Sequence, residues 1–117
     1  NIDNLYKTKE RVKLGELQKN QANDAMTLFQ QNLDMVVNAA YTKYQEALQQ
    51  AEILNDAKNL ADENYKITEA KYLNQLAVQA EMIDAQNQKL QSELDFANAE
   101  INVLYQYYNL LKSTGTL

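Results

Sequence analysis

Glu81 and Asp84 are the residues with the clearest potential for chemistry in this sequence. They are three positions apart, so a helix places both carboxylates on one face. Two acids on the same helix face do not flank a substrate as the carboxylates of a glycosidase do, and the chain has no EF-hand-like loop for Ca²⁺. The pair therefore predicts either a surface that attracts cations or two ordinary solvated acids, and not a catalytic centre.

The composition excludes most other chemistry. Histidine and cysteine are both absent, which removes most nucleophile–base pairs, disulfides and transition-metal sites. The net charge is −5 with acids and bases interspersed, so no basic patch suits nucleic acid. We expect no enzymatic activity, no cofactor and no metal site. No apolar run approaches the roughly 20 residues of a membrane-spanning helix. No signal peptide is visible at Asn1, which fits either a cytosolic chain or a mature piece of a longer protein.

The elements that position these acids are helices. The 117 residues contain no proline and two glycines, Gly15 and Gly115, and are rich in good helix formers. We expect an all-α fold in which 1–117 form a single segment. It consists of one helix over about 5–72, a turn over about 72–77 and a second helix over about 77–112. The fold class is a long antiparallel helical hairpin or coiled coil.

Apolar residues recur at alternating steps of three and four in both halves, as in a heptad seam. The first-half seam is Leu33, Val37, Ala40, Tyr44, Ala47, Ala51, Leu54, Lys58, Ala61, Tyr65, Thr68 and Tyr72. The main second-half seam is Leu76, Ala80, Ile83, Asn87, Leu90, Leu94, Ala97, Ile101, Leu104, Tyr108 and Leu111. A further stripe runs beside it through Phe96, Ala99, Val103, Tyr107 and Leu110. Two stripes predict a helix with neighbours on two sides.

The unequal helix lengths predict an unpartnered region. At 1.5 Å per residue the first helix is roughly 100 Å long and the second roughly 54 Å. If the chain turns, residues 5–36 expose Leu14, Leu17, Met26, Phe29 and Leu33 to water. A contiguous patch of that kind marks an interface. We therefore expect the chain to be incomplete or oligomeric.

The local sequence leaves the turn itself open. Asn74 tolerates left-handed backbone, and Asn74–Gln75 interrupts the apolar spacing. Leu76, Ala77 and Val78, however, would continue a helix without strain. Both a turn and an unbroken helix fit these residues.

Three stretches resemble the TolC-like outer-membrane efflux proteins. AKYLNQLAVQAEMIDAQ (70–86) is similar to the signature of the family's second hairpin, in which a tyrosine precedes a short polar turn and an acidic, aliphatic, aspartate–alanine run. FANAEINVLYQYYNLLKSTGTL (96–117) resembles the closing segment of the family, and VVNAAYTKYQEALQQAEILNDAKNLADENY (36–65) its long preceding helix.

The resemblance implies a homotrimer that spans the outer membrane of a Gram-negative bacterium as a β-barrel and crosses the periplasm as a barrel of helices. This chain would be the second periplasmic hairpin, part of the tunnel wall and tip gate of a tripartite export system, and the outer-membrane parts would lie outside it. The tip would contact a periplasmic adaptor protein and an inner-membrane transporter through Tyr72, Leu73, Asn74, Gln75, Leu76 and Ala77. Gln75 replaces the usual glycine, and Ala77 stands where some members carry a base. Glu81 and Asp84 match acids at the pore entrance, where three subunits would form a ring of about six carboxylates.

Other interpretations of the same pattern remain. A non-catalytic coiled-coil scaffold or oligomerisation hairpin, cytosolic or extracellular, would show the same heptads. A helical enzyme or lipid-binding bundle fits less well, because histidine and cysteine are missing and the apolar residues do not form a single face.

Overall fold

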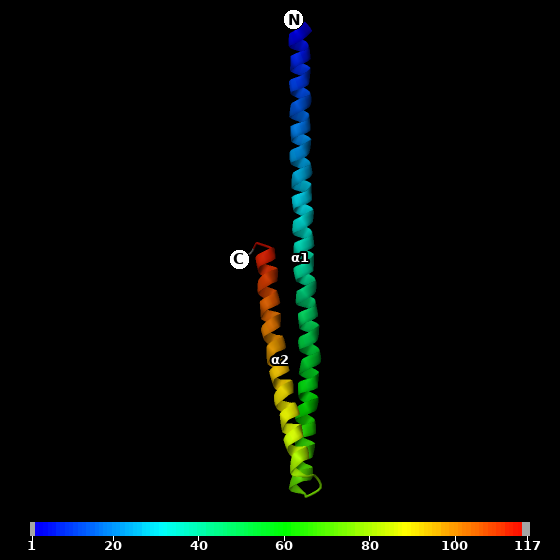
Figure 1. The fold of residues 1–117 in the computed structure, drawn as a ribbon, viewed down its shortest axis with the longest axis vertical. Helices are drawn as coiled ribbons and strands as arrows, with labels where there is room; N and C mark the ends of the chain where they lie inside the picture. Colours follow the sequence, from blue (N-terminus) through cyan, green and yellow to red (C-terminus); the bar gives the residue numbers. More distant parts are fainter. Residues whose placement is uncertain (1, 116–117) are drawn as a thin grey trace. The chain divides into compact units, whose positions relative to one another are not determined.

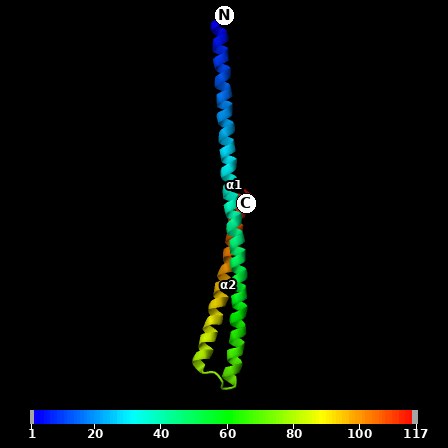
Figure 2. The same cartoon turned by 90° about the vertical axis from the view of Figure 1, so that its right-hand side faces the viewer.

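Two helices account for nearly all of the chain. In the computed structural model, which describes residues 2–115, α1 spans Ile2–Leu73 and α2 spans Gln79–Ser113. Figure 1 shows α2 returning beside the part of α1 that precedes the turn, and Figure 2 shows the same arrangement after a quarter turn. The described residues contain no strand. The prediction of an all-helical hairpin is confirmed, and the chain turns where the sequence left two possibilities open.

The described residues divide into two units, with the boundary between Asn38 and Ala39. The sequence predicts one segment with helices over about 5–72 and 77–112. The observed helices begin and end within a few residues of these bounds. As predicted, the first helix is continuous, and it runs through the boundary between the two units. In the first unit, every described residue from 2 to 36 is exposed. The second unit contains the hairpin.

The face of α1 that packs in the hairpin is the predicted one. Each member of the predicted seam from Val37 to Thr68 is half-buried or buried, and Ala47 is 4% exposed. Leu33 and Tyr72, at the two ends of the predicted seam, are exposed. Small residues such as Ala40, Ala47 and Ala51 allow the neighbouring helix to approach closely.

For α2 the sequence predicts two stripes without choosing which one faces α1, and the packed stripe includes Phe96, Ala99, Val103 and Leu110 of the predicted further stripe. The half-buried and buried stripe is Met82, Ala85, Lys89, Ser92, Phe96, Ala99, Val103, Gln106, Leu110 and Ser113. The main predicted seam lies on the side of α2 that faces away from α1, and all its members except Leu111 are exposed. In this stripe the small residues Ala85 and Ala99, 3% and 8% exposed, alternate with larger ones, of which Phe96 and Lys89 contact Lys58 and Tyr65 of α1.

Contacts between the helices fix an antiparallel register. The rings of Tyr44 and Tyr107 lie 5.6 Å apart between centroids. The Lys58 ammonium lies 4.7 Å from the centre of the Phe96 ring, and that of Lys89 lies 4.7 Å from the Tyr65 ring. Each cation–aromatic contact lets a lysine occupy the seam, because its stem packs while its charge stays near water.

Candidate functional site

The hairpin tip is a tight helix ending that continues into an extended residue. The backbone N–H of Gln75 donates to the Tyr72 carbonyl (3.0 Å), and that of Leu76 donates to the Lys71 carbonyl (2.7 Å). This pair of bonds defines a Schellman motif, in which the residue after the helix cap takes left-handed backbone. Here that residue is Gln75, with a φ of 60°.

The left-handed position falls one residue later than the sequence favours. Asn74, the expected candidate, instead donates from its side-chain Nδ2 to the Ala70 carbonyl at 2.9 Å and closes the last turn of α1. At the other end of the hairpin, Gly115 takes the corresponding role after α2, with a φ of 75°. The tip thus uses a side-chain-bearing residue in a conformation that favours glycine.

The tip also presents apolar side chains to solvent. Leu73 and Leu76 are 72% and 78% exposed, Val78 is exposed, and Tyr72 is 40% exposed. Asn74 and Gln75 are exposed as well, while Ala77 is half-buried. The structure therefore brings the six sequence-predicted tip residues together in and beside one turn, with two leucines available for contact with another molecule. Their role as a partner contact stays a prediction.

Glu81 and Asp84 lie in the first two turns of α2, immediately after the tip. Val78 caps this helix through its backbone without a side-chain hydrogen bond, and the Glu81 carboxylate in the first turn is favourably placed near the positive end of the helix dipole. Both acids are exposed. At about 100° per residue, they lie roughly midway between the stripe that faces α1 and the outward stripe of α2. Further polar residues continue along their side of the helix: Gln88, Gln91, Asp95, Asn98 and Asn102.

The outward side of α2 carries a stripe of large aliphatic residues. Ile83, Leu90, Leu94, Ile101 and Leu104 are 47–69% exposed, with Leu104 the most exposed of the five. At about 100° per residue, the centre of this outward stripe lies about 150° around the helix from the stripe that faces α1. The face with more aliphatic surface is therefore the one that the hairpin leaves uncovered.

α1 has an uncovered apolar side too. Within the hairpin, Ile53, Leu60 and Ile67 follow one another by seven residues, and all three are more than half exposed. Seven residues bring a helix back to nearly the same side, so these residues form a second stripe, roughly 130° around α1 from the packed seam. In the first unit, Met26, Phe29 and Leu33 form another exposed group. Both helices thus carry apolar surface for neighbours that the hairpin does not supply.

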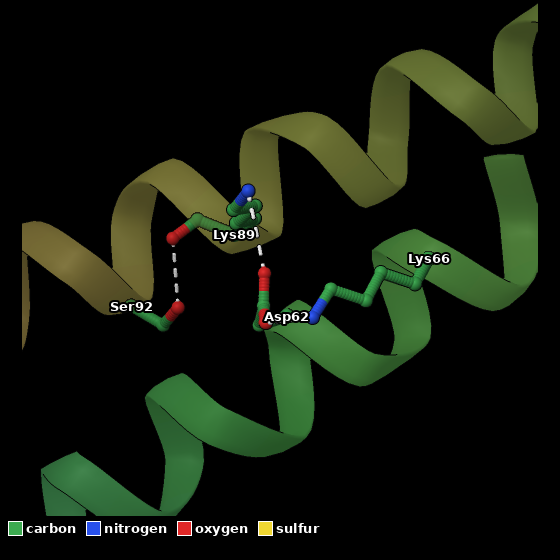
Figure 3. Close-up of polar contacts among 4 residues, drawn as sticks. All are labelled: Asp62, Lys66, Lys89 and Ser92. Atoms are coloured by element: carbon green, nitrogen blue, oxygen red, sulfur yellow. Dashed lines mark hydrogen bonds and ion pairs between the residues drawn. The ribbon is translucent and has the colours of Figure 1, made fainter.

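One charged cluster ties the two helices together near the tip (Figure 3). Asp62 on α1 accepts from Lys66 on the same helix at 3.1 Å and pairs with Lys89 on α2 at 3.3 Å. These hydrogen bonds, first from Lys66 and then from Lys89, lower the pKa of the Asp62 carboxyl below its usual value. The sequence predicts Lys58 in the seam, but it gave no signal for Lys89, because Lys89 lies outside both predicted stripes.

The described residues show neither a metal site nor a membrane-spanning helix. Among residues 2–115, no group of three or more carboxylates could hold a metal ion, and no helix is long and apolar enough to cross a membrane. Comparison of the chain with protein-family models, with curated proteins and with solved structures finds no match.

Proposed function

We propose that the chain is a segment of a channel wall: the second periplasmic hairpin of a TolC-like outer-membrane efflux protein, working without catalysis. The observation that carries the proposal is the outward stripe of α2, including Ile101 and Leu104 at 63% and 69% exposure. Burial of aliphatic surface is worth roughly 25 cal/mol per Å², so a helix with such a stripe on the side away from its partner is stabilised by a second neighbour.

The separation of the stripes favours a wall over a compact bundle. In a four-helix bundle, each helix meets its adjacent neighbours at roughly right angles around its axis. The stripes of α2 lie about 150° apart instead, which suits helices set side by side in a wide ring. The second stripe of α1, at Ile53, Leu60 and Ile67, supplies a surface for the next neighbour on that side. In the proposed trimer, these neighbours come from other parts of the parent protein and from adjacent subunits.

Glu81 and Asp84 suit the pore side of such a wall. If the two stripes of α2 are covered by neighbouring helices, the residues between them face either the lumen or the outside. The stretch that begins with these two acids and continues through Gln88 and Gln91 is polar, as a water-filled path requires. Three copies would place about six carboxylates near the entrance, where they would hold cations and repel anions.

The tip suits contact with partners. Leu73 and Leu76 are exposed at the turn, and exposed aliphatic residues at an end of a hairpin provide an anchor for a protein partner. In the proposed export system, the adaptor and the inner-membrane transporter dock at this end, and the gate opens as the helices rearrange. A non-catalytic scaffold is the alternative function, and it would use the same stripes only for oligomerisation.

Ion conduction by the polypeptide that carries this chain tests the proposal. In planar bilayers we expect conductance with a preference for cations, which the double substitution Glu81→Gln and Asp84→Asn reduces. Glu93→Gln and Glu100→Gln are matched controls, because these acids lie on the opposite side of α2 and should leave the preference unchanged. Absence of conductance, together with recovery of the parent protein away from the outer membrane, would refute the channel and favour the scaffold.

A further inference from the structure

The side of α2 that carries Glu81 and Asp84, here called the acid side, continues as two regular columns of residues. One column is Glu81, Gln88, Asp95 and Asn102, and the other is Asp84, Gln91, Asn98 and Tyr105. The members of each column follow one another by seven residues, so they share nearly one direction around the helix. Before Tyr105 both columns consist of carboxylates and amides alone. The side that the channel proposal assigns to the pore therefore stays polar over most of the helix.

Asp95 differs from the other members of these columns in how its side chain is held. It is half-buried, whereas all the others are exposed. The side-chain Nε2 of Gln91, one turn earlier, donates to Asp95 Oδ1 at 2.9 Å. A hydrogen bond of this kind to a carboxylate fixes the direction in which it points. The ion pairs among the described residues join Asp62 to two lysines and leave Asp95 without a base.

α2 contributes no base to the acid side. The bases of this helix are Lys89 and Lys112. Lys89 belongs to the stripe that faces α1, where its ammonium pairs with Asp62 at 3.3 Å. Lys112 lies in the last turn of the helix, beyond both columns. The carboxylates of the two columns therefore have no positive charge from their own helix to offset them.

α1 adds bases to the acid side only near its two ends. One flank of α1 lines a groove with Glu100 of α2 through Glu52, and this groove marks the opposite side of the hairpin. The other flank, at about 100° per residue, runs beside the acid side. Its residues are Lys43, Gln50, Ala57, Asn64 and Lys71. Because Lys58 contacts the Phe96 ring across the hairpin, the uncharged middle of this flank lies at the level of Asp95.

The distance of Asp95 from the two acids near the tip separates their electrostatic effects. Asp95 follows Asp84 by eleven residues, which is about 16 Å along a helix. Charges in water are screened over about 8 Å at physiological ionic strength. At about that distance, one unit charge changes the local concentration of a monovalent ion roughly twofold. The carboxylate of Asp95 therefore acts on passing ions independently of Glu81 and Asp84.

We propose that Asp95 is a second selectivity-determining position of the pore, deeper than the entrance acids, at which each copy contributes one carboxylate. Rings of charged side chains select ions by the sign of their charge, so this position attracts cations and repels anions inside the pore. The amides around it offer both hydrogen-bond donors and acceptors. The solutes that pass most readily are therefore hydrophilic and either cationic or neutral. This inference rests on the proposed channel function and extends it from the entrance into the pore.

Reversal potentials in planar bilayers test Asp95 in the polypeptide that carries this chain. Asp95→Asn should lower the ratio of cation to anion permeability by about twofold. The amide keeps the shape of the side chain and an acceptor for Gln91, so only the charge is lost. The effect should multiply with that of the double substitution at Glu81 and Asp84, because the two positions are further apart than the screening length. Glu93→Gln, on the opposite side of α2, is the matched control and should leave the ratio unchanged.

The results for Asp95 and for the entrance acids distinguish this inference from the function on which it rests. An unchanged permeability ratio in Asp95→Asn, beside a lowered ratio in the entrance variant, would overturn the second position and leave the channel standing. Absence of any conductance would refute the channel and this inference with it.

Thiol modification gives a second readout, of which side of α2 faces the pore. The 117 residues contain no cysteine, so a single cysteine can be introduced at a chosen position. A bulky cationic thiosulfonate should reduce the current through Asp95→Cys, with the unaltered protein as the reference. The current through Glu100→Cys should not change, because Glu100 lines the groove on the opposite side of the hairpin. The reverse pattern would place the pore on that opposite side and overturn the role of Asp95.

Discussion

Replacing Gln75 with glycine should stabilise the hairpin. Gln75 holds a φ of 60° at the tip, where its backbone N–H donates to Tyr72 and the following N–H donates to Lys71. A left-handed conformation costs an L-residue roughly 1–2 kcal/mol, because Cβ approaches the following carbonyl oxygen. Glycine has no Cβ, and it keeps both hydrogen bonds because they use only backbone atoms.

The expected gain is smaller than the relieved strain. Glycine makes the unfolded chain more flexible, which lowers the free energy of unfolding by roughly 0.5–1 kcal/mol. The net effect of Gln75→Gly is therefore an increase of about 0.5–1 kcal/mol. Since glutamine at this position is exposed, no packing is lost on its removal.

Urea denaturation followed by far-UV circular dichroism measures this difference, with both proteins at the same concentration because any self-association shifts the midpoint. Gln88→Gly is the matched control. It makes the same chemical change at an exposed helical position of α2 and should lower the free energy of unfolding by about 1 kcal/mol. If Gln75→Gly were as destabilising as Gln88→Gly, the left-handed tip and the reasoning from it would be refuted.

Four further substitutions probe other parts of the chain. Ala99→Leu should lower the free energy of unfolding by about 1–3 kcal/mol through overpacking of the seam, whereas Leu104→Ala should change hairpin stability far less; urea midpoints compare them. Gly15→Ala should raise the helicity of the first unit, as measured by circular dichroism, and stabilise it by about 0.5–1 kcal/mol. A loss of helicity would contradict the structure, in which Gly15 is helical and has space for a Cβ atom. Asp62→Asn should make the stability of the hairpin less sensitive to acid. The pKa of Asp62 is lowered in the folded state, so its ionised carboxylate stabilises the fold above the usual Asp pKa of about 4. This stabilisation is lost as the pH falls through the folded pKa. Thermal melts at neutral and acid pH test this, and an unchanged difference between the two pH values would count against the role of the Lys66 and Lys89 contacts.

The sequence predicts the hairpin well because its signals are local. Helix formers and the lack of proline define the helices, and the interrupted spacing at Asn74 allows a turn there without requiring it. The packed face of α1 is also predicted, because residues from Val37 to Thr68 form a single regular seam there. These features depend on neighbours in the chain and need no knowledge of what packs against them.

The face of α2 could not be predicted in the same way. α2 has two regular stripes, and hydrophobicity favours the one through Leu90 and Ile101, which is uncovered. Which stripe faces α1 depends on the direction in which the turn starts α2 and on how the side chains of the two helices fit together. Both are properties of the packed pair of helices and not of α2 alone. For the candidate site, the tip residues and the two acids are neighbours in the sequence, and their proposed roles concern other molecules, which the sequence of this chain does not describe.

The small buried core of the hairpin has a thermodynamic consequence. Among the described residues, the buried hydrophobic ones are three alanines, Ala47, Ala85 and Ala99. Unfolding raises the heat capacity mainly in proportion to newly hydrated apolar surface, about 0.45 cal/K/mol per Å². A hairpin with so little interior should show a small heat-capacity increment and a flat stability curve. Warming should therefore melt the isolated hairpin gradually, and docking of neighbours should sharpen the transition.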